Sequence, residues 1–524
     1  MRWLLGLLLT FFLILGFIIL KTRWSTQKSH LGYKFDLNLK SDKLGPLKVG
    51  FSKTEITPTN LNFFADHSRS PTEKPAGIGT FYDPSSNEII NTLWLAGFQR
   101  NRPAAGISDP LWARAVAIDD GSISLVLVSL DAIGILHNDV VDIRTMVPEQ
   151  YRPDYILISA TNTHGAPDLI GIWGSSEFSS GISDRYLAQV KSRTVATIVN
   201  AMKSRVPAKL KFAQSNEEAE SLVEDTRPPE IKDPRVRVMQ AISMDNDSTL
   251  GTLVSWANKP AVMGNTNQKI SSDFAFYLRD AMEEGILNDD PDRIQPGIGG
   301  ICIFFNGAIG GTMTTTPQLA IPSVYGAIRD PGAEKSLEVG EAVARIALKS
   351  LRAEHTVTLI QSRLRISART IELPLDNPQM RLAMALGIVP RSFTRPDGWP
   401  WGGFIRSEMA AFAIGNVQFL SIPGEIFPEI VNGGVSAPVG RDFNLSPQEV
   451  PPFRKLMNGE INFILGLSND FIGPIIPMSQ WDSEPPWLYL QKQPTHGEAH
   501  SLGPNTAREI YRNGRELLQQ LNEP

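Results

Sequence analysis

The amino-acid sequence predicts an α/β protein of mixed α+β character, in which mixed β-sheets carry antiparallel hairpins and are covered by helices. Three pairs of apolar, alternating segments flank short turns and are typical of hairpins: 113–118 with 123–131, 235–244 with 249–256, and 409–414 with 417–422. Amphipathic segments typical of helices are 184–204, 274–284, 333–354 and 506–521. Sheets with an apolar face need covering helices, so these patterns together predict a layered architecture.

The N-terminal segment predicts a single-pass membrane anchor within residues 1–24. Residues 3–20 read WLLGLLLTFFLILGFIIL and carry no charge, which approaches the roughly 20 apolar residues that cross a bilayer. A cleaved signal peptide has a shorter apolar run of about 7–15 residues, and here Lys21 and Arg23 follow in place of a cleavage site. Basic residues flank both ends and do not set the orientation. We expect a membrane protein with an extracytoplasmic body.

The rest of the chain is expected to form a stalk at residues 25–47 and a folded body at residues 48–524. The stalk is predicted because its residues are polar and lack a periodic apolar pattern. The fold is expected to begin near Lys48. Two loops rich in proline or acidic residues, 216–234 and 394–403, have lengths that are often found at functional rims.

Composition excludes several classes of protein and site. Charged residues make up 20% of the chain and the formal net charge is -5, so no basic excess favours a nucleic-acid partner. The mean hydropathy of -0.11 suits a globular body. Cys302 is the only cysteine, which excludes an intrachain disulfide and a cysteine-based zinc cluster. Its apolar neighbours predict a buried, unreactive thiol.

Familiar catalytic signatures are missing, but four polar segments each follow directly on a predicted strand. The sequence contains no HExxH, CxxC, GxSxG or complete phosphate-binding loop. The four segments are TNTH at 161–164, NKP at 258–260, NG at 306–307 and PGE at 423–425. Enzymes built on sheets gather reactive groups on loops that leave strand ends. We therefore expect His164, Lys259, Asn306 and Glu425 to line a common cleft.

The same segments carry a resemblance to the neutral/alkaline ceramidases. SATNTHGAPD at 159–168 resembles the family segment Ser-Ala-Thr-His-Thr-His-Ser-Gly-Pro. Further similar fragments follow in the family's order: VGFSKTEITP at 49–58, GISDPLWARA at 106–115, SLD at 129–131, NG at 306–307, SIPGE at 421–425 and GLSN at 466–469. The chain is identified from these fragments as a divergent relative of the ceramidase catalytic domain, over about residues 48–521.

The resemblance implies a zinc-dependent amidase whose metal site is eroded. The family holds zinc with two histidines, a glutamate and a tyrosine; His164 and Glu425 match two of these positions, and Pro474 stands at that of the tyrosine. Ser108 replaces the other family histidine, so the adjacent Asp109 is the candidate third ligand. Catalytic zinc needs about three protein ligands and an open position, where it lowers the pKa of bound water.

Other family positions imply further candidate roles. Thr312 and Thr314 lie near the position of the family serine, and with Lys259 they are the candidate catalytic residues. Asn162, Asn306 and Asp273 are the candidate substrate contacts, although Asp273 is equally suited to cap the helix that follows it. In place of a metal, the ammonium group of Lys259 could balance the Glu425 carboxylate, because a buried carboxylate needs a cationic partner.

Two functions follow from the resemblance. The first is a membrane-anchored, neutral ceramidase-like hydrolase that cleaves the amide of N-acylsphingosine or a related lipid with a degraded zinc site. The alternative is a catalytically inactive protein of the same fold that binds lipid or a partner. The sequence leaves open whether the chain is an enzyme. The expected partners are a membrane lipid or sphingolipid and the membrane itself, through the N-terminal helix. Neither function requires nucleic acid.

Overall fold

The computed structural model contains two β-sheets that pack face to face. It describes residues 30, 32–58, 78–83, 88–216, 218–286, 294–324, 326–394, 403–436, 449–494 and 497–523, with isolated positions 3, 6 and 16. The smaller sheet has the strand order β1 (Asp36–Lys40), β21 (Leu364–Pro374), β22 (Phe404–Ile414), β23 (Val417–Ser421) and β25 (Ile461–Leu465). Neighbouring strands in it are antiparallel except for the parallel pair β23 and β25.

The larger sheet is also mixed. Its order is β16 (Ile301–Asn306), β12 (Thr249–Trp256), β11 (Arg237–Ser243), β10 (Val206–Gln214), β3 (Lys48–Glu55), β7 (Trp112–Asp119), β8 (Ser124–Leu130) and β9 (Tyr155–Ala160). A ninth strand, β19 (Val357–Leu359), pairs with β10. The two outer pairs, β12 with β16 and β8 with β9, are parallel. The side chain of Asn306, the last residue of β16, donates to the carbonyl of Thr161, which follows β9, so the carboxyl ends of β16 and β9 lie together.

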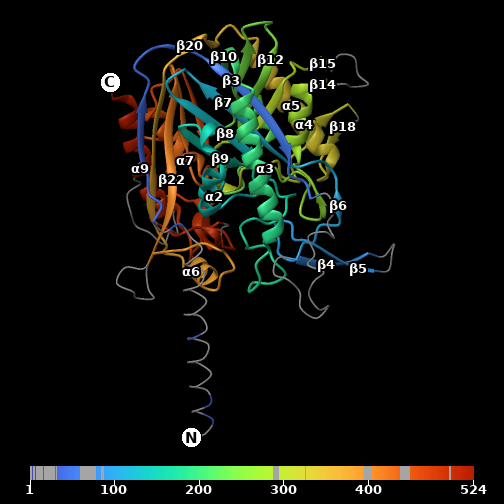
Figure 1. The fold of residues 1–524 in the computed structure, drawn as a ribbon. Coiled ribbons are helices and arrows are strands. Elements are labelled where there is room, and N and C mark those ends of the chain that lie inside the picture. Colours follow the sequence, from blue (N-terminus) through green and yellow to red (C-terminus); the bar gives the residue numbers. More distant parts are fainter. Residues whose placement is uncertain are drawn as a thin grey trace.

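Helices cover the outer face of each sheet, which gives four layers (Figure 1). Helix α9 (Thr506–Asn522) packs on β21 and β22. On the other side, α3 (Asp184–Lys203), α4 (Phe274–Glu283) and α5 (Ala333–Leu351) pack on the larger sheet. The remaining helices are α2 (His137–Met146), α6 (Pro378–Ala385), α7 (Pro428–Asn432), α8 (Phe453–Leu456), η2 (Glu149–Tyr151), η3 (Glu218–Leu222), η5 (Gly310–Thr312), η7 (Met478–Gln480), η8 (Leu488–Leu490) and η9 (Glu498–His500).

In the described ranges, six further pairs of strands are present: β2 (Gly45–Pro46) with β20 (Gln361–Ser362), β4 (Ile78–Asp83) with β5 (Glu88–Leu93), β6 (Gly106–Ile107) with β13 (Lys269–Ile270), β14 (Gly285–Ile286) with β15 (Gln295–Pro296), β17 (Ile321–Ser323) with β18 (Gly326–Ile328), and β24 (Glu425–Ile426) with β26 (Pro474–Ile475). The pairs β6 with β13 and β24 with β26 are parallel. Both pairs join segments that are distant in sequence.

A row of buried phenylalanines holds the two sheets together. Phe412 and Phe463 stack on either side of Phe419, with ring centroids 4.6 and 4.5 Å away. Phe212 of the larger sheet meets Phe419 edge-on at 6.5 Å. Each of these rings is fully buried. Aromatic pairs of this kind add roughly 0.5–1.5 kcal/mol each beyond the area they bury, so the contact strongly favours one packing of the sheets.

The elements predicted from local pattern are confirmed. The three hairpins are β7 with β8, β11 with β12, and β22 with β23, each antiparallel. The four helices are α3, α4, α5 and α9, with ends within three residues of the predicted ones. Ser183 begins α3 as an N-cap, since its hydroxyl accepts a hydrogen bond from the Tyr186 amide. The mixed, helix-covered fold class is likewise confirmed.

The predicted start of the fold near Lys48 is too late. Residues 33–47 were expected in the stalk, yet β1 pairs with β21 over five residues, from Asp36 opposite Arg369 to Lys40 opposite Arg365. Leu37 and Leu39 pack against the core between the sheets. The folded body therefore begins near Tyr33. Apart from the isolated positions 3, 6 and 16, the predicted anchor at residues 3–20 lies outside the described residues; among those described, no helix has both the length and the apolar character of a membrane span.

We predict that a fragment beginning at Lys48 is less stable than one beginning at His30. The shorter fragment leaves the edge of β21 unpaired and removes three half-buried apolar side chains, Phe35, Leu37 and Leu39, from the sheet core. At about 1.5–3 kcal/mol for each fully buried side chain, the loss should be on the order of 3 kcal/mol. Urea unfolding of the two fragments measures it, and equal midpoints would show that β1 adds nothing.

Candidate functional site

A small pocket opens where loops from both sheets meet. Its volume is about 160 Å³. The apolar part of its wall comes from Phe98, Ile133, Ile172, Trp173, Phe427 and Phe471. The polar part comes from His164, Lys259, Glu425 and His500, and glycines and Pro474 complete the lining. Three of the four residues expected in a common cleft, His164, Lys259 and Glu425, therefore line this pocket.

Lys259 and Glu425 form a nearly buried ion pair in the pocket. Lys259 Nζ lies 2.5 Å from Glu425 Oε2, and the two side chains are 11% and 10% exposed. Glu425 opens β24, and its amide donates to the Gly473 carbonyl (3.0 Å). Lys259 follows β12, with its amide bonded to the Met313 carbonyl (3.0 Å). The pair thus joins a loop of the larger sheet to a loop of the smaller one.

His164 stands beside this pair with an enclosed ring nitrogen. Its Nδ1 has no hydrogen-bond partner among the described residues. The ring of Phe98 meets the imidazole edge-on at 4.6 Å. Burial, together with the positive charges of Lys259 and Arg102, holds the pKa of His164 well below its usual value. The imidazole is therefore neutral at pH 7, which suits it to exchange hydrogen bonds with a ligand and not to pair with an anion.

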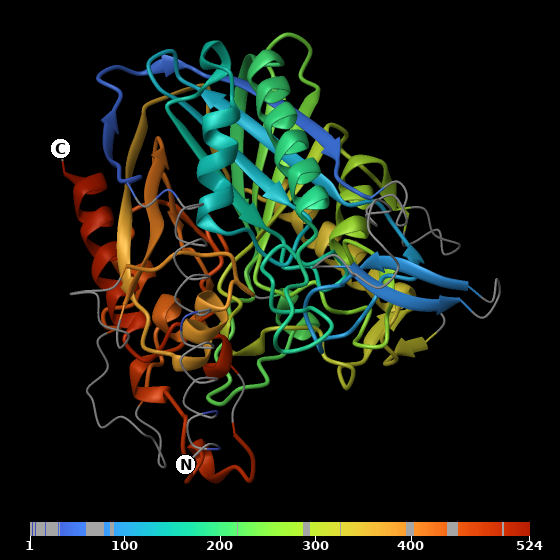
Figure 2. The same ribbon diagram turned by 60° about the horizontal axis from the view of Figure 1, so that its bottom comes forward.

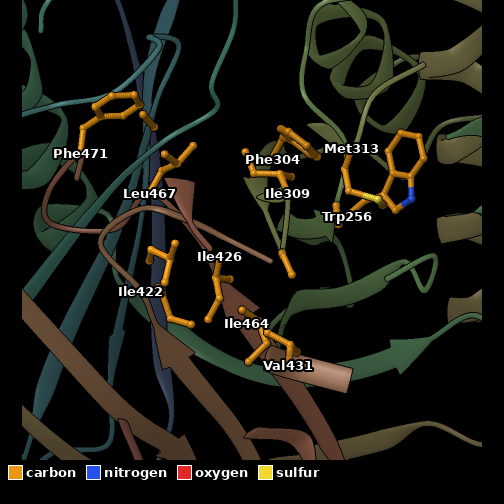
Figure 3. Packing of buried hydrophobic residues seen from close by; sticks show 14 of the residues in the cluster. Trp256, Phe304, Ile309, Met313, Ile422, Ile426, Val431, Ile464, Leu467 and Phe471 are labelled. Atoms are coloured by element: carbon orange, nitrogen blue, oxygen red, sulfur yellow. The ribbon is translucent and has the colours of Figure 1, made fainter. Parts of the chain in front are cut away.

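Densely packed apolar side chains support the pocket from below. The pocket residues Ile133, Trp173, Phe427 and Phe471 belong to the same buried cluster as side chains from β12, β16, β25 and α7. Figure 3 shows this packing, with Trp256 and Phe304 of the larger sheet, Ile464 of the smaller sheet, and Ile422 and Ile426 of the segment that follows β23. The pocket floor is therefore held by both sheets at once.

Asp109 and Asp273 lie away from the pocket. The carboxylate of Asp109 accepts hydrogen bonds from the Ser271 hydroxyl and from the Ser272 amide (2.7 Å) and hydroxyl (2.9 Å). It is not among the residues that line the pocket with His164 and Glu425. Asp273 caps α4, where it accepts from the Phe274 amide (2.6 Å) and the Met263 amide (2.8 Å). These contacts favour the capping interpretation of Asp273 over a substrate contact.

Asn162 and Asn306 are fully buried under the pocket and do not line it. Asn162 has a positive φ of 65° and donates from Nδ2 to the Ile133 carbonyl (2.9 Å). Asn306 donates to the Thr161 carbonyl and accepts from the Asn258 amide (3.3 Å). Both amides thus shape the loops that carry His164 and Lys259. As placed, neither can contact a ligand directly.

The two candidate threonines lie next to Lys259 in the backbone. Thr314 forms bridges with Lys259 and Glu224, and its hydroxyl lies 3.5 Å from the Lys259 carbonyl. It does not line the pocket. Thr312 ends η5, and its side chain lies outside the described part of the structure. Thr314 therefore stabilises the backbone of the loop that carries Lys259 without lining the pocket.

Comparison with known proteins agrees with this architecture. No family model matches the chain. Its structure is similar to that of neutral ceramidase from Pseudomonas aeruginosa, with a TM-score of 0.61 and 15% identity over 91% of this chain and 74% of the other. A ceramidase complexed with C2 gives a TM-score of 0.60 and 14% identity over 90% and 75%. The chain has the neutral ceramidase fold. This confirms the fold that the sequence resemblance implied.

Within this ceramidase fold, the described side chains do not fit a catalytic zinc ion. Such an ion takes about three protein ligands. In the described ranges, no group of three or more His, Cys, Asp or Glu side chains is placed to hold a metal. Asp109 is bonded to serines, and Pro474 pairs in register with Glu425 without offering a ligand atom. The ammonium group on Glu425 would repel a divalent cation.

Sequence reasoning missed the pocket wall around Phe98 and Arg102. The guanidinium of Arg102 donates to the carbonyls of His164 and Ala96 and lies 5.1 Å from the centroid of the Phe98 ring. Gly97 has a φ of +79°, and a Cβ there would overlap the His164 ring. In the sequence, this part of the wall is marked by a glycine, Gly97, followed by an aromatic residue, Phe98. The sequence does not show that these two residues contact His164, because that contact joins segments that are distant along the chain.

A second buried group of charges lies behind Phe427. Glu429 of α7 has one carboxylate oxygen, Oε2, without a partner among the described residues. Burial, with a smaller contribution from nearby Asp225, raises the pKa of Glu429 to about 8, although hydrogen bonds and the charge of Arg227 act to lower it. The Arg227 guanidinium lies 5.4 Å from the centroid of the Phe427 ring. Glu429 is therefore largely protonated at pH 7.

We predict that Glu425→Gln lowers the free energy of unfolding by about 3–5 kcal/mol, because it leaves a buried ammonium group without its counter-ion. The double variant Lys259→Met/Glu425→Gln should recover part of this loss, since it removes both charges. The matched control is Glu372→Gln, which breaks the exposed pair with Lys34 and should cost less than about 1 kcal/mol. Chemical denaturation measures all three; equal effects of the two single variants would contradict a buried pair.

A second prediction concerns pH. The native pKa of Glu429, about 8, exceeds its ordinary value of 4.5, so the folded state holds a proton that the unfolded chain releases between these values. Stability should therefore fall as pH rises from about 4.5 to about 8, by at most roughly 1.4 kcal/mol per pH unit from this group. Glu429→Gln, which mimics the protonated acid, should flatten the slope. An unchanged slope in unfolding experiments at pH 5, 6.5 and 8 would contradict the raised pKa.

Proposed function

We propose that this protein binds an amphipathic lipid amide, of the N-acylsphingosine class, and does not hydrolyse it with a metal-bound water. The observation that carries the proposal is the Lys259–Glu425 ion pair, which occupies the carboxylate that the resemblance assigns to zinc. The ligand class is suggested by the neighbours, both of which are ceramidases. The predicted membrane anchor agrees with a lipid ligand.

The pocket chemistry suits the polar end of such a lipid. An ammonium group has three N–H donors, and Lys259 gives one of them to Glu425. The others can donate to an amide carbonyl or a hydroxyl group, with the neutral imidazole of His164 as a second polar contact. Rings of Phe98, Trp173 and Phe471 surround these groups. At about 160 Å³, the pocket is smaller than the roughly 300–1,000 Å³ of typical ligand sites, so it suits a headgroup better than a whole lipid.

A membrane-anchored ceramidase-like hydrolase is the second candidate. It is favoured by the position of His164 and Glu425, which match two zinc ligands of the family and line one pocket. This function requires an additional group that balances or replaces the ammonium of Lys259. The two candidates differ in metal content and in product release.

The test uses the full chain in detergent with a short-chain N-acylsphingosine. We expect less than one zinc per ten chains by mass spectrometry, measurable binding by calorimetry and no fatty-acid release. Lys259→Met should weaken binding about tenfold or more, because a hydrogen bond from a charged donor contributes about 1.5–3 kcal/mol. The double variant Lys259→Met/Glu425→Gln leaves no buried charge unpaired and should also bind weakly. Weak binding by this variant would show that the loss comes from the missing ammonium group and not from misfolding. The control Lys269→Met changes an exposed lysine outside the pocket and should bind normally.

One zinc per chain together with fatty-acid release would overturn the binding function in favour of the hydrolase. Absence of binding in the wild-type chain would overturn the lipid ligand itself. Equal binding by Lys259→Met and the wild type would show that the ion pair takes no part.

A further inference from the structure

A second hollow lies beside the pocket and opens at the same end of the molecule. Its volume is about 390 Å³, and Ile172 and His500 line both cavities. Helix α6 forms one wall through Met380, Leu382 and Leu386, and the loop that contains Glu177 and Phe178 forms the other. We call this second cavity the α6 groove. Aliphatic side chains from α6 line it together with Phe178 and with the polar side chains of Arg100, Glu177, Gln379 and His500.

The mouth of the α6 groove exposes large apolar side chains. Phe178 is 76% exposed and Leu382 is 51% exposed, and both line the groove. A single exposed apolar side chain needs no explanation, but two large ones at the rim of one cavity mark a surface that lipid can cover. Arg100 and Glu177 at the rim lie 3.6 Å apart, so their charges compensate each other. The face therefore does not require an anionic partner.

The route of the chain toward the predicted anchor ends close to this face. His30 Nε2 lies 2.6 Å from Asp142 Oδ1 on α2. One turn earlier on α2, Asn138 donates to the Pro390 carbonyl (3.3 Å), two residues after Ile388 of the groove lining. Figure 1 shows α6 at the lower end of the body, which Figure 2 turns toward the viewer, and α2 above it. The last described contacts before the anchor are thus beside the α6 groove.

The length of chain between anchor and body restricts the distance to the bilayer. Nine residues, 21–29, separate the apolar run 3–20 from His30. Fully extended, they span at most about 30 Å, at roughly 3.3–3.6 Å per residue. Because residues from Tyr33 onward belong to the folded body, no long stalk separates this body from the bilayer. A short tether also keeps the local concentration of lipid high at this end.

We propose that the face formed by α6 and the loop at 174–180 docks on the bilayer that holds the chain's own anchor. Phe178 and Leu382 enter the lipid, and the α6 groove opens into the hydrocarbon region. The occupant is bilayer lipid of any headgroup charge. The proposal rests on the predicted anchor and on the groove, and it is independent of the ion pair in the neighbouring pocket.

The experiment uses the full chain reconstituted in phosphatidylcholine vesicles. Cys302 is buried, so a cysteine introduced at an exposed position can be labelled selectively with an environment-sensitive fluorophore. The variants are Phe178→Cys, Leu382→Cys and the control Met244→Cys. Met244 is 49% exposed, a fraction similar to that of Leu382, and it follows β11 in the hairpin with β12, which Figure 1 labels near the top, away from α6. Lipids that carry a nitroxide on the acyl chain act as the quencher.

Labels at Phe178 and Leu382 should be quenched at least twofold more than the label at Met244, and their emission should shift to the blue. Adding Leu382→Glu to the Phe178 variant should reduce that quenching, because a carboxylate opposes insertion. Equal quenching at all three positions would overturn the proposal, as would a chain that does not float with the vesicles. Lipid-amide binding in detergent is measured separately, so failure of one proposal does not imply failure of the other.

Discussion

The packing of two apolar sheet faces against each other is the constraint on which the site depends. Phe212 of the larger sheet meets Phe419 of the smaller, and this contact brings the ends of β12, β16, β23 and β25 together. Backbone and side-chain bonds then cross between the sheets: the Gly466 amide donates to the Asn306 carbonyl (3.0 Å), and the hydroxyls of Ser159 and Ser468 lie 2.6 Å apart. A cleft between these loops follows from the sheet packing.

The charges in that cleft are balanced locally. A carboxylate loses much of its hydration when it is nine-tenths buried, and it persists only with a cation or a proton. Glu425 has the cation, from Lys259. Glu429, on the next helix, has no cation bonded to its free oxygen and takes the proton, as its raised pKa indicates. Two acids four residues apart thus satisfy the same constraint in different ways, and only the first faces the pocket.

Local patterns were sufficient for much of the fold and for part of the site. Hairpins and amphipathic helices are short-range features, since their periodicity and turn residues can be recognised in one segment. Strand β1 was missed because DLNLK alternates only briefly and is stabilised by pairing with β21, far along the chain. Asp109 was misleading for a related reason: its neighbour in the sequence suggested a ligand, but Ser271 and Ser272 bind its carboxylate from a distant segment.

The sequence by itself determined three hairpins, four long helices, their order and the resemblance to ceramidases, because these depend on residue type and spacing along the chain. It also singled out His164, Lys259 and Glu425, each of which follows a strand. The tertiary structure decided which of the candidates face one pocket, that Lys259 pairs with Glu425, and that Phe98 and Phe427 form the wall. These outcomes depend on side-chain directions and on contacts between distant segments, which residue order alone does not fix.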